Sequence, residues 1–147
     1  MTPSLPKLNF PSVHLRARRN GARTEVWDPL RGMWLVLTPE EWVRRHLAAF
    51  LVSHCRVPMQ RIVQEYPVSL NGQPQRADIV VVGDDGRPLI LAECKAAGVT
   101  VGDAVLAQAV RYNSVLQATY VILTNGLNHY CYRFDGSGYL PCEFPVL

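Results

Sequence analysis

Several common features are absent from this 147-residue sequence, and each absence excludes a class of protein. No stretch approaches the ~18 consecutive apolar residues that a membrane-spanning helix needs, so we expect no membrane partner. The first ten residues lack the charged start and apolar run of a secretory signal peptide. The four cysteines form no CxxC pair and have no histidine at zinc-finger spacing, so we interpret them as reduced thiols of a cytoplasmic protein.

Lysine is scarce, because two lysines stand against 13 arginines, and a lysine within a motif is therefore conspicuous. The net charge of +3 is unevenly distributed: residues 1–61 carry ten Lys/Arg and four Asp/Glu, whereas residues 62–147 carry five and eight. A basic first half is suited to face phosphate groups, although a solvated basic surface is the more common meaning of such a signal. With 48% hydrophobic and 18% charged residues, the chain has the length and composition of one globular domain.

The first part of the chain is predicted to be an extended arm followed by a β-hairpin. Three prolines within residues 1–12 predict the arm. Within residues 13–37, residue types alternate in the manner of β-strands on both sides of Asn20-Gly21, which is a strong turn signal. A third short strand is expected at 33–37. The core is expected over residues 38–134, within a single domain that spans 13–147.

The periodicity of the core predicts an α/β fold. Thr38 suits the N-cap of a helix that runs to about residue 54, and Glu41 stands three positions later, as a capping box requires. The elements expected after it are strands at 61–70, 76–82 and 88–96, a helix over 102–117, and strands at 120–124 and 129–134. Because a helix separates the strands at 88–96 and 120–124, these two strands are expected to be parallel. The prediction is a mixed central sheet flanked by helices, preceded by the N-terminal β-hairpin.

Three charged residues lie in strands that are otherwise apolar. Glu93 and Lys95 are two positions apart and share one face, whereas Cys94 points into the opposite layer. If the strands at 76–82 and 88–96 form a hairpin, Asp78 lies across from residues 91–93. Two adjacent carboxylates repel each other unless a hard cation such as Mg²⁺ or Mn²⁺ binds them, and the backbone carbonyl of Cys94 is a further candidate ligand.

Lys95 beside such a metal would orient or deprotonate the attacking water, or stabilise the phosphorane. This set of groups suits metal-assisted hydrolysis of a phosphodiester. The alternative is a structural ion pair at the end of a strand, because so short a pattern often occurs by chance.

Five sequence blocks occur in order, and together they resemble the N-terminal nuclease domain of type I restriction enzyme R subunits. The blocks are TPEEWVR (38–44), RADIV (76–80), LILAECKA (89–96), QAVRYN (108–113) and LTNG (123–126). The resemblance runs from about residue 28 to 134. It implies membership of the PD-(D/E)XK superfamily, a restriction-endonuclease-like fold, and activity as an Mg²⁺-dependent DNA endonuclease.

The resemblance also implies roles for individual residues. Asp78 and Glu93 match the metal-binding carboxylates, and Lys95 matches the catalytic lysine. Gln108 and Tyr112 match a Q-x-x-x-Y element, and their spacing of four places both on one helix face, which is suited to face the site. Glu41 matches a glutamate of the first helix that can complete the metal site, with a capping-box role as its alternative. Two further possible ligands are Glu40 and Glu65; for Glu65, a simple exposed position is an equal alternative.

Arginines are the predicted contacts to nucleic acid. The hairpin contributes Arg16, Arg18, Arg19 and Arg23 as an electrostatic DNA contact. Arg44 is expected to touch phosphate or to pair with a carboxylate of its own helix. Arg76 is two residues before Asp78, so it is expected to brace the site or contact DNA.

The chain contains no GxxxxGK[ST] motif, so it carries no ATP-driven motor of the kind that the R subunit couples to its nuclease. The expected partners are therefore DNA and a separate helicase/translocase or specificity subunit, with a homodimer as one route to a double-strand break. The rival hypothesis is a non-catalytic nucleic-acid-binding or assembly module that keeps the nuclease fold. A structure-specific nuclease acting on junctions or RNA is a third alternative.

Overall fold

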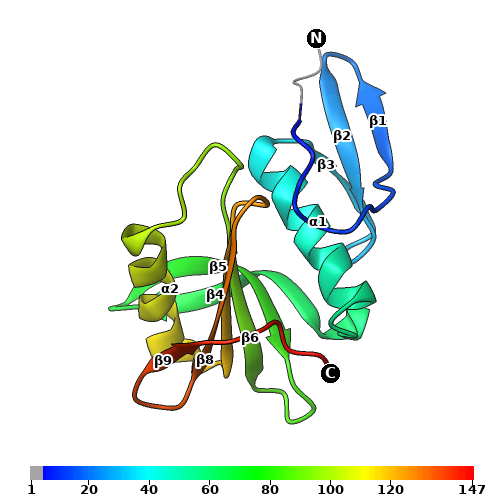
Figure 1. Cartoon of the computed structure of the whole chain (residues 1–147). Coiled ribbons are helices and arrows are strands. Elements are labelled where there is room, and N and C mark those ends of the chain that lie inside the picture. The colour runs from blue at the N-terminus through cyan, green and yellow to red at the C-terminus, as the bar shows by residue number, and fades with distance from the viewer. Residues whose placement is uncertain (1–4) are drawn as a thin grey trace.

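The computed structural model describes residues 5–147 and contains two β-sheets and two α-helices (Figure 1). The N-terminal elements are β1 (Ala17–Asn20), β2 (Arg23–Asp28), β3 (Met33–Val36) and α1 (Pro39–Ser53). After a 3₁₀ turn (Met59–Arg61), the remaining elements are β4 (Ile62–Leu70), β5 (Gln73–Val82), β6 (Pro88–Cys94), α2 (Asp103–Leu116), β7 (Tyr120–Thr124), β8 (His129–Phe134) and β9 (Tyr139–Pro141).

The N-terminal hairpin forms as predicted and is part of a separate small sheet. Strands β1, β2 and β3 are antiparallel and follow one another in chain order. The turn between β1 and β2 contains Gly21 at φ +63°, a backbone conformation that glycine adopts without steric cost. The third short strand expected at 33–37 is β3.

The central sheet is mixed, which confirms the predicted α/β architecture. Its six strands follow the order β4-β5-β6-β7-β8-β9, with β4 to β6 forming the predicted antiparallel meander. The chain then crosses through α2, and β7 runs parallel to β6 from Ile90↔Tyr120 to Cys94↔Thr124. This parallel pair is the one expected from the helix between the two strand segments.

The two helices pack on opposite faces of the central sheet (Figure 1). One core cluster joins α1 to the face of β6 that carries Ile90 and Ala92, and the other joins α2 to the face that carries Leu91. Burial on both faces explains why β6 is an uninterrupted apolar run in the sequence. Within residues 5–147, no helix has the length and apolar character needed to cross a membrane.

The predicted N-terminal arm, as far as the structure describes it, packs against the core. Leu8 is buried, and the backbone N–H of Asn9 donates a hydrogen bond of 2.7 Å to the carbonyl of Gly126. Gly126 has φ +86°, and a Cβ at this position would lie 2.7 Å from a methyl group of Leu8. A glycine is therefore required where the arm meets the loop after β7. Residues 1–4 of the predicted arm lie outside the described residues.

Strand β9 was not expected, since the last strand predicted from the sequence ends at residue 134. Asp135 accepts hydrogen bonds from the backbone N–H groups of Ser137 and Gly138, which closes a tight turn. The chain then pairs with β8 from Phe134↔Tyr139 to Tyr132↔Pro141. Pro141 is tolerated because β9 is the edge strand of the sheet.

Candidate metal-binding and catalytic site

Strands β5 and β6 bring Asp78 and Glu93 together at the point where the two strands separate. Ile79↔Ala92 is the last paired position in this direction, so Asp78 and Glu93 are the next residues along each strand. The carboxylate of Asp78 replaces the missing backbone pairing, because its Oδ2 accepts a 2.8 Å hydrogen bond from the N–H of Cys94. The prediction that Asp78 lies across from residues 91–93 is confirmed.

Glu93 is a buried carboxyl group with an unsatisfied oxygen. The residue is 6% exposed, and its Oε1 has no hydrogen-bond partner within the described part of the chain. Burial, together with a hydrogen bond to Asp78 and the negative charge of Asp78, raises the pKa of Glu93 to about 9, and the positive charge of Lys95 offsets only part of this rise. Without a cation, Glu93 therefore holds a proton at neutral pH.

Lys95 and Gln108 share a cavity with Glu93. The cavity has a volume of about 260 Å³ and lies between the end of β6 and the first turns of α2, where Ala104 and Val105 complete its lining. A 2.9 Å hydrogen bond from the backbone N–H of Lys95 to the carbonyl of Thr124 anchors the chain after β6. The packing of Cys94 in the opposite core cluster confirms the predicted alternation. The structure thus brings Glu93, Lys95 and Gln108 to one solvent-accessible space.

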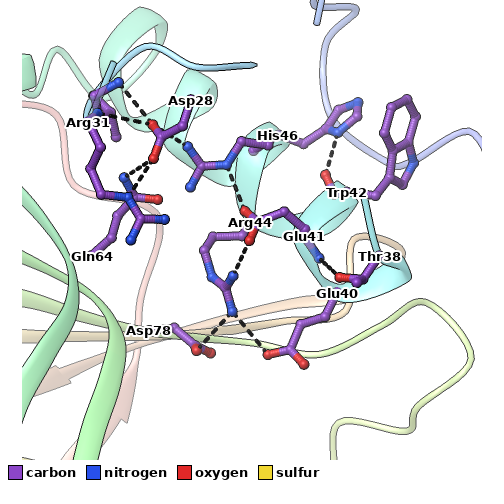
Figure 2. A network of polar contacts seen from close by, with 12 residues as sticks. Asp28, Arg31, Thr38, Glu40, Glu41, Trp42, Arg44, His46, Gln64 and Asp78 are labelled. Atoms are coloured by element: carbon purple, nitrogen blue, oxygen red, sulfur yellow. Dashed lines mark hydrogen bonds and ion pairs between the residues drawn. The ribbon is translucent and has the colours of Figure 1, made fainter. Parts of the chain in front are cut away.

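Glu41 is held by two arginines instead of facing this cavity freely (Figure 2). Its Oε1 accepts a 2.6 Å hydrogen bond from Arg44 and its Oε2 accepts a 2.9 Å hydrogen bond from Arg45. The N-cap of α1 forms as expected, since the backbone N–H of Glu41 donates to Thr38 Oγ1 at 3.0 Å. The side chain of Glu41 binds the arginines and does not close a capping box.

Arg44 connects α1 to the carboxylate of Asp78. Its Nη2 donates to Glu40 Oε1 and to Asp78 Oδ1, each at 3.2 Å, in addition to the Nη1 bond to Glu41 (Figure 2). The prediction that Arg44 pairs with a carboxylate of its own helix is confirmed. Its contact with Asp78 was not foreseen, because it joins residues 34 positions apart.

A second polar network, centred on Asp28, was missed by sequence reasoning. Asp28 is fully buried and contacts Arg45 at 2.6 Å, Arg31 at 2.7 Å and the amide of Gln64 at 2.9 Å (Figure 2). Burial acts to raise the pKa of Asp28, but the hydrogen bond from Arg31 and the charge of Arg45 outweigh it and hold the pKa below its usual value. The signal available in the sequence was the position of Asp28 two residues after the inward-facing Val26.

Tyr112 and Glu65 are not brought to the cavity. Tyr112 is one turn beyond Gln108 on α2, but it is 6% exposed and packs in the core cluster with Val68 and Ala77. Glu65 is exposed and forms a 3.1 Å ion pair with Arg31. The catalytic role implied for Tyr112 and the ligand role considered for Glu65 stay predictions.

The site holds part of a cation-binding set. Within residues 5–147, no group of three or more His, Cys, Asp or Glu side chains is arranged to hold a metal ion. Two carboxyl groups do meet, however, and the unpartnered Oε1 of Glu93 is a buried oxygen donor of the kind that Mg²⁺ and Ca²⁺ prefer. The donor chemistry of Asp78 and Glu93 therefore fits a hard divalent cation.

Apart from Arg44, the predicted DNA-contacting arginines lie on exposed surfaces. The guanidinium group of Arg16 is 5.1 Å from the ring centre of Trp34, and that of Arg18 is 4.2 Å from the same ring. Arg18 also pairs with Glu25 at 2.9 Å. Arg19 is exposed on β1, as Arg76 is on β5. Arg16 and Arg18 thus form an arginine–tryptophan surface on the N-terminal sheet.

Comparisons with known proteins identify a matching family and similar solved structures. Residues 39–140 match the family described as "Type I restriction enzyme R protein N terminus (HSDR_N)". Among solved structures, one similar chain is "the fragment structure of a putative HsdR subunit of a type I restriction enzyme from Vibrio vulnificus YJ016", with a TM-score of 0.57 and 20% identity over 75% of this chain. Another is a "putative nuclease belonging to DUF820 from Anabaena variabilis ATCC 29413", with a TM-score of 0.48 and 10% identity over 84% of this chain and 79% of that chain.

The chain spans 24% of the length of the Vibrio structure. No curated protein matches it. The family match covers well over half of the chain, from the start of α1 to the middle of β9, and includes Asp78, Glu93, Lys95 and Gln108. The chain therefore belongs to the family of type I restriction enzyme R protein N-terminal domains.

Proposed function

We propose that this chain is a DNA endonuclease domain that hydrolyses phosphodiester bonds with the help of a divalent cation, Mg²⁺ or Mn²⁺. The observation that carries the proposal is the meeting of Asp78 and Glu93 beside a cavity that Lys95 and Gln108 also line. Membership of the R-protein N-terminal family supports a nuclease-like domain.

Asp78 and Glu93 are the proposed metal ligands, with the backbone carbonyl of Cys94 as a third. A bound divalent cation would polarise the scissile phosphate and favour formation of the nucleophile from water. Binding would also draw the proton from Glu93, because a nearby positive charge favours the ionised form of a carboxyl group. Glu41 is a further proposed ligand, and it becomes available only when its contact with Arg44 is released.

Lys95 is the proposed catalytic base or electrostatic stabiliser. Its ammonium group carries the charge needed to stabilise the negative oxygens of the phosphorane, and in its neutral form the amine accepts a proton from the attacking water. Gln108, in the same cavity, is placed to hydrogen bond to substrate or water through its amide. For Tyr112 we propose support of this face of α2, since its ring lies in the core.

DNA is the proposed substrate, and arginines are its proposed contacts. Exposed guanidinium groups at Arg16, Arg18, Arg19 and Arg76 would bind backbone phosphates, and Arg44 would do so after leaving its carboxylate partners. A type I R protein works within a larger assembly, so we propose a helicase/translocase or specificity subunit as a partner. One site cuts one strand, and a homodimer would allow a double-strand break.

The test is cleavage of supercoiled plasmid with Mg²⁺ or Mn²⁺, with EDTA as the metal-free control. Lys95→Ala should lower the rate by at least about 100-fold, the usual contribution of a positioned acid–base group. The matched control is Lys7→Ala, because Lys7 is the other lysine of the chain and is exposed in the arm. Its rate should equal that of the wild type.

The same assay addresses the alternative of a non-catalytic binding module, which the exposed arginine–tryptophan surface favours. That alternative predicts salt-sensitive DNA binding that survives Asp78→Ala, and no metal-dependent product from the wild type. Metal-dependent cleavage that Lys95→Ala leaves intact in a folded protein would place the catalytic site elsewhere.

A further inference from the structure

Arg44 occupies a position that is unusual for an ion-paired arginine, because it is shared among three carboxylates from two elements. Its Nη1 and Nη2 contact Glu41, Glu40 and Asp78 at 2.6, 3.2 and 3.2 Å, and Figure 2 shows the guanidinium group between these side chains. The Nε of Arg44 is buried and has no hydrogen-bond partner among the described residues. The side chain is therefore held by its charge more than by a complete set of hydrogen bonds.

The negative charge around Asp78 explains what holds Arg44 there. Burial acts to lower the pKa of Arg44, but the charges of Glu41 and Asp78 outweigh it and raise the pKa above its usual value. Arg44 thus neutralises the ligands that the proposed cation would use. Two cations close to the same Asp78 oxygen would repel each other, so the guanidinium group and a divalent cation compete for one place.

Arg45, the next residue of the same helix, is more deeply buried than Arg44. Its side chain is 1% exposed and is fixed between Glu41 and the fully buried Asp28. Arg44 is 12% exposed at the edge of the site, and its long, flexible side chain is able to swing toward solvent. Of these two arginines, Arg44 is the one whose release leaves the hydrophobic core intact.

We infer that Arg44 is an internal counterion that holds the place of the divalent cation, and that cation binding displaces its guanidinium group from Asp78. The inference rests on the proposed metal-dependent function. Displacement frees Oδ1 of Asp78 and Oε1 of Glu41, two of the three carboxylate oxygens that Arg44 now contacts. It also releases a positive side chain beside the cavity, where a substrate phosphate would meet it.

The test measures Mn²⁺ binding to the full chain by isothermal titration calorimetry. Arg44→Gln should bind Mn²⁺ roughly tenfold more tightly than the wild type, because charge-assisted hydrogen bonds no longer have to be broken first. The matched control is Arg133→Gln, which removes the same charge from an exposed position on β8. It should change the affinity by no more than about threefold, the effect of a screened surface charge.

Equal affinities for the two variants, or weaker binding by Arg44→Gln, would overturn the inference and leave the metal site in place. Absence of Mn²⁺ binding by the wild type and both variants would overturn the proposed metal dependence, and the inference with it. Where Arg44→Gln is poorly folded, the wild type supplies a second readout. The NMR signal of the Arg44 Nε–H, assigned by its loss in Arg44→Lys, should shift on addition of Mg²⁺; an unchanged signal at saturating Mg²⁺ would equally contradict displacement.

Discussion

Two groups of buried charge lie beside α1, and they differ in how completely they are paired. In the first group, Asp28 is satisfied by Arg31, Arg45 and Gln64, with contacts of 2.6 to 2.9 Å. In the second group, Glu93 has an oxygen with no partner, and it stands next to a second carboxyl group, that of Asp78. The carboxylate of the first group is fully paired within the protein, although Arg45 Nη2 and Gln64 Oε1 around it have no hydrogen-bond partner among the described residues. The carboxyl pair of the second group is incomplete.

This difference distinguishes a structural network from a binding site. A buried carboxylate whose two oxygens are both paired ties elements together, and Asp28 joins the N-terminal sheet to α1 and β4 in this way. A buried carboxyl group without a partner costs stability, and such a cost is typical of positions retained for a ligand or for chemistry. Glu41 links the two groups. It contacts Arg45, which pairs with Asp28, and Arg44, which pairs with Asp78.

The largest stability effect is expected from Asp28→Asn. The substitution keeps the volume of the side chain but leaves Arg45 buried with one carboxylate partner in place of two, so we expect a loss of about 3–5 kcal/mol in the free energy of unfolding. Urea unfolding followed by circular dichroism measures this change. A loss below about 1 kcal/mol would mean that the network is not what joins the N-terminal sheet to the core.

Glu93→Gln should have the opposite effect on the metal-free protein. The pKa of Glu93 is about 9 in the folded state and near its ordinary value of 4.5 in the unfolded chain. Between these pH values the folded state holds one more proton than the unfolded chain. The free energy of unfolding is therefore highest at low pH and falls as the pH rises toward 9. Glutamine removes this titration and should stabilise the protein by at least about 1 kcal/mol at about pH 8.

The measurement is the free energy of unfolding in EDTA across this pH range for the wild type and Glu93→Gln. The two curves should meet at acid pH and separate as the pH rises, while cleavage is lost in the variant. A variant that is less stable than the wild type at every pH would show that Glu93 acts as a paired structural charge, like Asp28. Excess Mg²⁺ should narrow the gap, because the cation binds the ionised carboxylate of the wild type.

The placement of Asp78 and Glu93 could be predicted from the sequence, because strand periodicity is local. The alternation around Glu93, Cys94 and Lys95 predicts their faces, and the hairpin spacing predicts that Asp78 lies opposite. The separation of Gln108 and Tyr112 by four residues predicts one helix face, but it cannot say how deeply each turn of that face is buried. The spacing therefore could not show that Tyr112 lies in the core.

The arginine contacts could not be predicted, since they depend on how α1 packs against distant strands. Asp28 meets Gln64 across 36 positions, and Arg44 meets Asp78 across 34. An arginine within E-x-x-R has several acceptors in reach, and only the tertiary packing decides among them. Strand β9 could not be predicted for a different reason. Its three residues end in Pro141, which is compatible with an edge position but not with an ordinary strand pattern.

The smallest effect is expected from Glu65→Gln. Glu65 pairs with the same Arg31 as Asp28 does, so an exposed and a buried carboxylate with the same partner can be compared directly. The side chain of Glu65 is 49% exposed and that of Asp28 is completely buried, although their contacts with Arg31 are similar, at 3.1 and 2.7 Å. Water screens the exposed pair and hydrates Glu65 when the pair is broken, so we expect a loss of at most about 1 kcal/mol, diminishing further at high salt. Cleavage and Mn²⁺ affinity should be unchanged if Glu65 is not a ligand. A loss of Mn²⁺ binding in this variant would instead show that Glu65 is a metal ligand. Arg31 would then contact both groups, Asp28 in the first and Glu65 in the second.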